Sequence, residues 1–511
     1  MRISRHWRRT IAGALAAGLL VAACGSDDDD SDSTEAPAEE ADEAVDSAVE
    51  DAEDTADSMV EDAEEAVDSA AEDAEDTAES MAEDAGSGEE LALEGEVEVA
   101  AGTMLNLDEC PDDWSATEGV DGDQIILGQS LPLSGPAAAF GPIANGMQAY
   151  FDYLNENDPI DGKELVLVAQ DDAYEAGRTV ANVQEMLDTE DIFAFTYIVG
   201  TPNNLAVRDT LDEACVPQLF NSTGFPLWGD PANYPWTIGG LLNYETETQI
   251  WCQNIVDELG EGATVAALVA NNDFGKTYQA ELEQCEADGQ IELADVQLHD
   301  PVAPDVTNEM TTLAATGADV FVAGTTGAYC PQSVGTVAAT DWRPLFYMSY
   351  TCNNLASFFA PVQEAAALLA EEGSGVRVTN SNKICGDPTY DDDPAIQQVV
   401  EVLDEYADGG CADGSYSTGV LFGTIVEDVL RTATAMPGGL NRVNLMSAIW
   451  NMDYTNDLLL GGTLRTDGVN DAFTSEAAEV QEVVVVDGQL TFNPLSEIID
   501  LEGEGGSYQG G

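Results

Sequence analysis

The sequence predicts an α/β fold built on parallel sheets, and three observations support this prediction. Short apolar runs alternate with amphipathic helical patterns from about residue 123 onward. The first run, residues 125–127, is continuously apolar, as expected for a strand buried on both faces. It leads into the turn segment 132–136, and a helical pattern follows over about 143–154. Repeated units of this kind imply parallel sheets with right-handed crossovers.

Residues 1–23 are predicted to be a signal peptide. Arginines precede an apolar stretch, residues 11–22, that is too short to span a bilayer. The box Val21-Ala22-Ala23-Cys24 resembles a lipoprotein signal-peptidase site, in which Cys24 is lipidated and becomes the mature N-terminus. A plain secretory signal with a chance cysteine is the alternative. The lipoprotein interpretation predicts an anchor at the extracytoplasmic face of the cell membrane.

Residues 24–104 are predicted to be an acidic low-complexity spacer. An 11-residue repeat starts near residue 44, with acidic pairs in phase at 50–51 and 61–62. Eleven residues are close to three helical turns, so a helix would keep the Ala-rich stripe nearly straight. Such a helix would reach about 60 Å. A self-associating helix and calcium binding by the Asp run are the alternatives.

The later pattern predicts one more helix, at about 176–187, and a late hairpin around Asp487-Gly488 with strands at 483–486 and 489–492. Further strands are predicted at 164–169, 193–199, 217–220, 264–270, 319–323 and 345–348.

The composition excludes several functions. The net charge is −85, with 14 basic and 99 acidic residues, which makes nucleic acid a very poor partner and suggests adaptation to high salt. Only two histidines are present, His6 in the targeting segment and His299, so neither a His-based triad nor a zinc cluster is expected. We expect His299 to lie at the surface or in a loop. No cofactor and no metal site is predicted.

The turn Pro-Leu-Ser-Gly-Pro at 132–136, followed by Phe140-Gly141, closely resembles the opening of type 1 periplasmic solute-binding proteins of the leucine/isoleucine/valine-binding family. The resemblance extends to about Asn493. It implies two Rossmann-like lobes with parallel sheets, joined by a three-crossing hinge. By analogy the crossings fall near 240, 380 and 470, which assigns 105–240 with 381–470 to lobe 1 and 241–380 with 471–511 to lobe 2.

Eight cysteines remain beside Cys24, and an even number in an exported protein suggests disulfides. Eight cysteines allow about a hundred pairings, and some of them could be free buried thiols. The placement of the predicted strands and helices favours particular pairs, each of which stays inside one lobe of the implied fold: Cys330–Cys352, Cys252–Cys285, Cys385–Cys411 and the remaining Cys110–Cys215.

The resemblance implies that a ligand binds between the lobes, with its carboxylate at helix starts. The loops at 200–204 and 221–224 occupy positions similar to the family's binding loops. We therefore expect Ser222 and Thr223 to contact the ligand, followed by Asn203 and Asn204. Turn and N-cap roles are the alternative for all four.

Aromatic residues complete the expected site. Phe274, in a turn resembling the family's Asp-aromatic-Gly motif, would join Phe140, Tyr329 and Tyr350 around an aromatic-walled pocket. The family's amino-acid binders pair the ligand ammonium with an acid in this region, but residues 347–352 contain none. An α-amino-acid ligand is therefore in doubt, unless Asp273 substitutes.

The leading hypothesis is a receptor that captures an amino acid or a related amide or carboxylate and delivers it to the permease subunits of an ABC importer. The alternatives are a sensory binding module, a structural lipoprotein and an exported hydrolase. The sequence lacks a Gly-x-Ser-x-Gly elbow, an HExxH motif and a Gly-rich phosphate loop, which argues against an enzyme, and no catalytic residues are expected.

Overall fold

The computed structural model describes residues 90–120, 122–407, 410–503 and 506–508. The predicted signal peptide, Cys24 and the 11-residue repeat lie outside the described residues.

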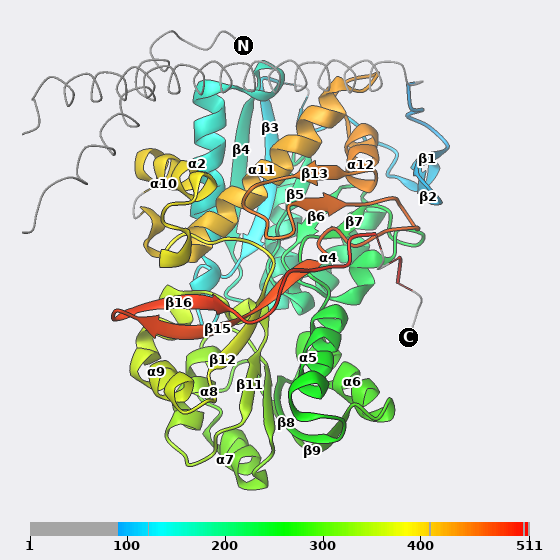
Figure 1. Cartoon of the computed structure of the whole chain (residues 1–511). Helices are drawn as coiled ribbons and strands as arrows, with labels where there is room; N and C mark the ends of the chain where they lie inside the picture. The colour runs from blue at the N-terminus through cyan, green and yellow to red at the C-terminus, as the bar shows by residue number, and fades with distance from the viewer. Residues whose placement is uncertain (1–89, 121, 408–409, 504–505, 509–511) are drawn as a thin grey trace, which may run out of the picture. The chain divides into compact units, whose positions relative to one another are not determined.

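The first lobe contains a sheet of five parallel strands in the order β4-β3-β5-β6-β7 (Figure 1). Helices cover both of its faces, so the strands are apolar on both sides, as the continuous runs predicted. In β3, Ile125 and Leu127 belong to the core on one face, and Ile126 packs on the other. The strands are β3 (Gln124–Leu131), β4 (Glu164–Asp171), β5 (Ala194–Thr196), β6 (Gln218–Asn221) and β7 (Thr237–Gly239).

The two faces of this sheet carry different helices. One core joins the sheet to α2 (Pro142–Asn157), α10 (Pro394–Tyr406), α11 (Gly414–Ala435) and α12 (Arg442–Trp450). The opposite core joins it to α3 (Ala176–Thr189) and α4 (Thr201–Glu213).

The second lobe contains a larger sheet, in which β16-β15-β12-β11-β10-β8-β9 lie side by side and β17 pairs with β15. Strands β8 to β12 are parallel to one another. At one edge, β15 pairs antiparallel with β12 and forms an antiparallel hairpin with β16. The strands are β8 (Ala263–Ala270), β9 (Ile291–His299), β10 (Val320–Gly324), β11 (Leu345–Met348), β12 (Val376–Asn380), β15 (Ala477–Val486), β16 (Gln489–Pro494) and β17 (Ile499–Asp500).

Helices again cover both faces of the second sheet. One core contains residues of α7 (Thr307–Thr316), α8 (Tyr329–Ala338) and α9 (Gln363–Glu371). The other contains residues of α5 (Tyr244–Leu259) and α6 (Asp273–Ala287).

The chain passes between the two sheets three times, between β7 and α5, between β12 and α10, and between β14 and β15. The fold is therefore the expected two-lobed α/β arrangement.

Two short hairpins add to the first lobe. Strands β1 (Glu96–Ala100) and β2 (Thr103–Asn106) pair, and side chains of Ser447 and Asn451 donate to the carbonyl of Val99. The predicted spacer boundary at residue 104 falls inside this hairpin. Strands β13 (Asp453–Thr455) and β14 (Thr463–Arg465) form the second hairpin.

All four expected disulfides are present: Cys110–Cys215, Cys252–Cys285, Cys330–Cys352 and Cys385–Cys411. Each joins residues of the same lobe, so none of them restrains one lobe against the other.

The predicted strands and helices are all present, with β5 shorter than expected. Several strands were not predicted, among them β9 and β12 of the second sheet. In β9 most side chains are half-buried or exposed, and β12 reads Val-Arg-Val-Thr-Asn, so neither presents a continuous apolar run.

Candidate ligand-binding site

A cavity of about 80 Å³ lies between the two lobes. Residues that follow the carboxyl ends of parallel strands line it from both sides, including Gly200 and Ser222 from the first sheet and Thr326 and Thr351 from the second. Open α/β sheets bind ligands at this end of their strands. One water needs about 10–15 Å³ of such space, so the cavity is large enough for several waters or for a small solute that displaces them.

Aromatic rings form much of the cavity wall. Tyr244 stacks on Tyr350 with ring centroids 5.6 Å apart and meets Phe274 edge-on at 5.1 Å. Tyr197 of the first lobe packs on Phe422 of α11 at 4.0 Å. The aromatic lining residues are Phe140, Tyr174, Tyr197, Tyr244, Phe274, Tyr350, Phe358 and Phe422.

The polar lining side chains are all neutral. Among the described residues that line the cavity there is no Asp, Glu, Lys, Arg or His. A ligand charge would therefore meet hydroxyls, amides and backbone groups rather than a counter-ion. The polar lining side chains, tyrosines apart, are Ser222, Thr326, Thr351, Asn353, Asn354, Thr379, Ser381, Asn382, Ser415 and Thr418.

Helix α4 presents its N-terminus at the cavity. Gly200, its N-cap, lines the cavity with a φ of 101°, and no side chain caps the first turn. The first amide groups of a helix have no partner within the helix and carry partial positive charge. They can therefore receive a ligand carboxylate here. By contrast, Asn272 caps α6 and Asp413 caps α11.

Tyr174 reaches the cavity from a strained loop after β4. Ala173 and Tyr174 have φ values of 50° and 64°, in a region that non-glycine residues rarely adopt. The buried carboxylate of Asp172 supports this turn by accepting from the Tyr174 amide at 2.8 Å. A Cβ on Gly200 would lie 2.5 Å from the Tyr174 ring, so the ring requires glycine there. The phenol hydroxyl has no protein partner among the described residues and is left available to a ligand.

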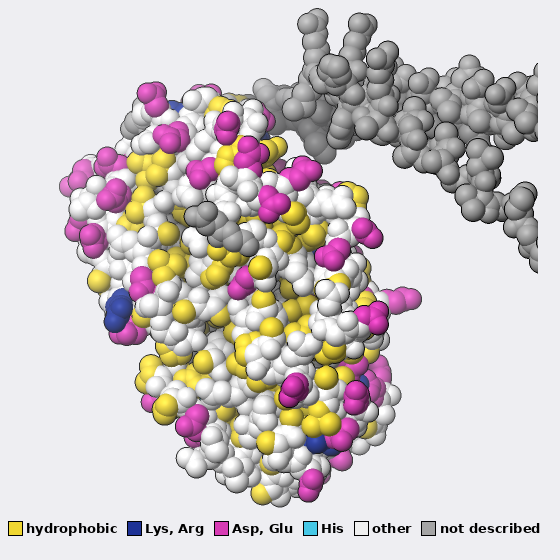
Figure 2. All heavy atoms as spheres, turned by 90° about the vertical axis from the view of Figure 1, so that its left-hand side faces the viewer, with side chains coloured by type: hydrophobic (Ala, Val, Ile, Leu, Met, Phe, Trp, Pro, Cys, Tyr) yellow, Lys and Arg dark blue, Asp and Glu magenta, His cyan; other side chains and the backbone are white. Residues whose placement is uncertain are grey.

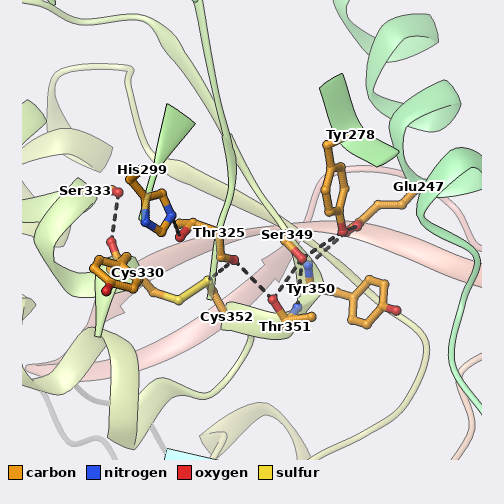
Figure 3. The surroundings of a disulfide bond; sticks show 11 residues. Glu247, Tyr278, His299, Thr325, Cys330, Ser333, Ser349, Tyr350, Thr351 and Cys352 are labelled. Carbon is orange, nitrogen blue, oxygen red and sulfur yellow. Dashed lines mark hydrogen bonds between the residues drawn. A yellow bond between two sulfur atoms is a disulfide. The ribbon is translucent and has the colours of Figure 1, made fainter. Parts of the chain in front are cut away.

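The buried carboxyl group of Glu247 lies beside Tyr278 and the backbone of Tyr350, which lines the cavity (Figure 3). Glu247 accepts hydrogen bonds from the Tyr350 amide at 2.9 Å and from the Tyr278 hydroxyl at 2.6 Å. Burial raises the pKa of Glu247 to about 8, so its neutral form predominates at pH 7. Glu247 therefore positions Tyr350, which lines the cavity, without placing a charge beside it.

This network continues across the second lobe to His299 (Figure 3). Ser349 links Tyr278 at 2.8 Å to Thr351 at 3.0 Å, and Thr351 donates to the carbonyl of Thr325 at 3.2 Å. The hydroxyl of Thr325 lies 2.7 Å from Nε2 of His299.

The prediction that His299 lies at the surface or in a loop was wrong. Only 1% of its surface is exposed, because it ends the unpredicted strand β9 and packs on Tyr329 with ring centroids 4.3 Å apart. Burial lowers the pKa of His299, which favours the neutral imidazole.

The structure brings four of the eight predicted ligand contacts together at the cavity: Phe140, Ser222, Phe274 and Tyr350. The other four lie outside the lining and hold nearby loops in place. The side chain of Asn203 donates to the hydroxyl of Thr179, and the hydroxyls of Thr223 and Thr201 are hydrogen-bonded to each other. Asn204 donates to the carbonyls of Ile198 and Gly200. The Tyr329 hydroxyl donates to the backbone carbonyls of residues 301 and 303. Asp273, the possible ammonium partner, is exposed and lines a separate crevice.

Several lining residues had no signal in the sequence. Thr418 and Phe422 come from α11, more than 170 residues from the first-lobe loops they meet. Tyr174 and Thr326 follow the ends of β4 and β10, a position that could have identified them.

The described residues contain no group of three or more His, Cys, Asp or Glu side chains placed to hold a metal ion. Among the same residues, no helix combines the length and apolar character needed to cross a membrane.

Two α/β lobes that enclose a cavity at the carboxyl ends of their strands define a bilobal ligand-binding protein. The chain belongs to the periplasmic binding protein family, whose model matches residues 124–488. As a member of this family, the chain is a binding protein and not an enzyme. No curated protein matches the chain.

Solved structures share the fold at low sequence identity. A branched-chain amino acid ABC transporter protein from Thermus thermophilus, with bound valine, has a TM-score of 0.63 and 18% identity over 74% of this chain and 96% of its own. A solute-binding protein from Rhodopseudomonas palustris BisB5, in complex with 3,4-dihydroxybenzoic acid, has a TM-score of 0.61 and 15% identity over 74% of this chain and 98% of its own. A fatty acid ABC transporter substrate-binding protein from Thermomonospora curvata has a TM-score of 0.62 and 16% identity over 76% of this chain and 96% of its own.

Proposed function

We propose that this protein is a lipid-anchored receptor on the extracytoplasmic face of the cell membrane. It captures a small solute between its two lobes and delivers it to the permease subunits of an ABC importer. Lobe 1 consists of residues 105–240 and 381–470, and lobe 2 consists of residues 241–380 and 471–511. The observation that carries this proposal is the cavity lined by both lobes, because a ligand that contacts both favours their closure. The anchor rests on the Cys24 box of the sequence.

The cavity favours a particular ligand chemistry. Its aromatic wall suits an apolar or aromatic body, and its neutral polar groups suit hydroxyl, amide or carboxylate substituents. A carboxylate would bind at the uncapped N-terminus of α4 beside Gly200 and Ser222. An α-amino acid would place its ammonium without an acidic partner, which is costly in an enclosed site. The ligand is therefore a small monocarboxylate or amide in preference to an amino acid.

A thermal-shift screen tests the proposal. The protein is unfolded and refolded to remove carried-over ligand, then heated with 4-hydroxybenzoate, benzamide, L-valine, urea and short aliphatic carboxylates. A ligand at 100 times its dissociation constant adds about 2.7 kcal/mol to the free energy of unfolding, which is readily seen. We expect monocarboxylates or amides to raise the melting temperature more than L-valine does.

A matched pair of variants locates the binding. Thr326→Trp fills the cavity and should abolish the shift, whereas Thr311→Trp, on the exposed face of α7, should retain it. An equal shift in both variants would mean that the ligand binds elsewhere. No shift with any compound would favour a structural lipoprotein over a receptor.

A further inference from the structure

We infer that Asp413 of the first lobe and Asn354 and Ser357 of the second form a latch that holds the two lobes closed over the ligand. This inference rests on the proposed function, because closure serves a protein that captures a solute. The three residues are positioning residues: Asp413 and Ser357 do not line the cavity and act by fixing one lobe against the other.

The latch joins two elements that belong to different cores. Asp413 is the N-cap of α11, which packs in the first lobe. Asn354 and Ser357 belong to the π-helix η8 (Leu355–Phe359) and its N-cap, which pack in the second lobe. Single π-helical turns occur often at functional sites.

Both carboxylate oxygens of Asp413 are used across the boundary. The Asn354 amide nitrogen donates to one oxygen and to the hydroxyl of Ser415, the latter at 2.8 Å. The Ser357 hydroxyl donates to the other oxygen at 2.9 Å. Hydrogen bonds to an ionised carboxylate are stronger than those between neutral groups.

Each half of the latch is organised within its own lobe. On one side, Asp413 accepts from the Ser415 amide at 2.9 Å, and the Cys385–Cys411 disulfide fixes the chain two residues away. On the other side, Asn354 accepts from the Ser357 amide at 3.0 Å, which holds the two donors as one unit. Little side-chain freedom is then lost when the lobes meet.

The latch lies next to the cavity. Phe358, the neighbour of Ser357, lines the cavity and meets Phe140 of the first lobe at 6.0 Å between ring centroids. The amide of Ala328 in the second lobe donates to the carbonyl of Pro136 in the first at 3.1 Å, so the lobes are in direct contact here as well. Closing the latch therefore closes the wall around the ligand.

Two variants test the latch. Ser357→Ala removes one donor and leaves the backbone bond to Asn354 intact. Asp413→Ser retains a good N-cap for α11 but is too short to reach the second lobe. The matched control is Ser333→Ala, because the Ser333 hydroxyl bonds only within α8 of the second lobe. Binding kinetics are measured with the compound that gives the largest thermal shift, or with 4-hydroxybenzoate.

We expect Ser357→Ala to raise the dissociation rate about tenfold, the effect of losing one charge-assisted bond, while the association rate stays nearly constant. Asp413→Ser should have the larger effect, and the double variant should not add to it, because both changes remove the same interaction. Ser333→Ala should bind like the parent protein. Equal dissociation rates in Ser357→Ala and Ser333→Ala would overturn the latch and leave the receptor function intact.

A second measurement tests the latch independently of whether a ligand has been found. Hydrogen exchange is followed in the peptides that contain residues 354–359 and 413–417, with and without the compound. Ser357→Ala should speed exchange in both peptides relative to Ser333→Ala, even if the parent protein binds none of the compounds tested. Unchanged exchange in both conditions would overturn the latch whatever the outcome of the binding screen.

Discussion

At the scale of single residues, the site combines a strained aromatic with neutral polar groups. Tyr174 adopts a left-handed backbone conformation and lines the cavity, and its hydroxyl has no protein partner among the described residues. Strain of this kind persists only where the surrounding structure enforces it, here through Asp172 and Gly200. We therefore assign Tyr174 the recognition of a polar substituent of the ligand.

Tyr174→Phe tests this assignment. The loss of one hydrogen bond to the ligand should weaken binding by about 3- to 10-fold, measured by calorimetry. The control is Tyr406→Phe, which removes an exposed hydroxyl that bonds to Glu156 outside the cavity and should leave the affinity unchanged. Equal affinities for both variants would show that the Tyr174 hydroxyl does not contact the ligand.

Glu247 couples the stability of the second lobe to pH. Its pKa of about 8 in the folded protein exceeds the value of about 4.3 for an exposed Glu. Between these pH values the folded state binds more protons than the unfolded state, so the contribution of Glu247 to stability falls as the pH rises and is constant above about pH 8.

Glu247→Gln removes this titration and keeps an acceptor for the Tyr350 amide. In urea unfolding at pH 5, 6.5 and 8, the free energy of unfolding of the variant relative to the parent should increase with pH. Parallel pH profiles for the two proteins would show that Glu247 is not protonated in the folded state.

At the scale of elements, the close crossing of α2 and α11 determines the cavity wall. A Cβ on Gly419 would lie 2.2 Å from the carbonyl oxygen of Ile143, and one on Gly146 would lie 2.0 Å from that of Tyr416. Both positions therefore need glycine for the helix backbones to approach. This approach sets the position of Thr418 and Phe422, which line the cavity from α11.

Gly419→Ala should separate the two helices and lower the free energy of unfolding by about 1–3 kcal/mol, together with ligand affinity. Gly177→Ala is the control, because nothing lies within 4 Å of a Cβ there and alanine favours the helix by up to about 1 kcal/mol. Urea unfolding distinguishes the two, and equal stabilities would mean that α2 and α11 tolerate a wider spacing.

At the scale of the whole molecule, the excess of acidic residues determines how stability depends on salt. Figure 2 shows acidic side chains over the visible face of the described part and few basic ones, in keeping with the formal charge of −85. The sequence contains 99 acidic residues and only 14 lysines and arginines, so most acidic groups have no basic partner. Their mutual repulsion opposes folding and is screened by salt.

The melting temperature should therefore rise when NaCl is increased from about 0.1 M to about 1 M, where the screening length falls from about 10 Å to about 3 Å. The increase should shrink near pH 4, because protonated carboxyl groups no longer repel each other. A melting temperature independent of salt at neutral pH would argue against adaptation to a saline environment.

Much of the fold could be predicted from the sequence, because its signals are local. Continuous apolar runs such as 265–270 identify buried parallel strands. The order of strands and helices was enough to favour the four disulfide pairs that the structure contains. The Pro-Leu-Ser-Gly-Pro turn with Phe140-Gly141 indicated the family. Strand β9, with its half-exposed pattern, gave no such signal, and the burial of His299 was missed with it.

The sequence by itself determined the α/β class and the acidic character. Together with the family resemblance, it favoured the two-lobed arrangement, the four cysteine pairs and a site between the lobes. Only the tertiary structure decided which side chains enclose the cavity. Thr418 and Phe422 of α11, the Asp413 latch and Glu247 behind Tyr350 depend on contacts between segments far apart in the chain. A local pattern records whether a residue is buried, but its partners across a cleft are set by how whole elements pack.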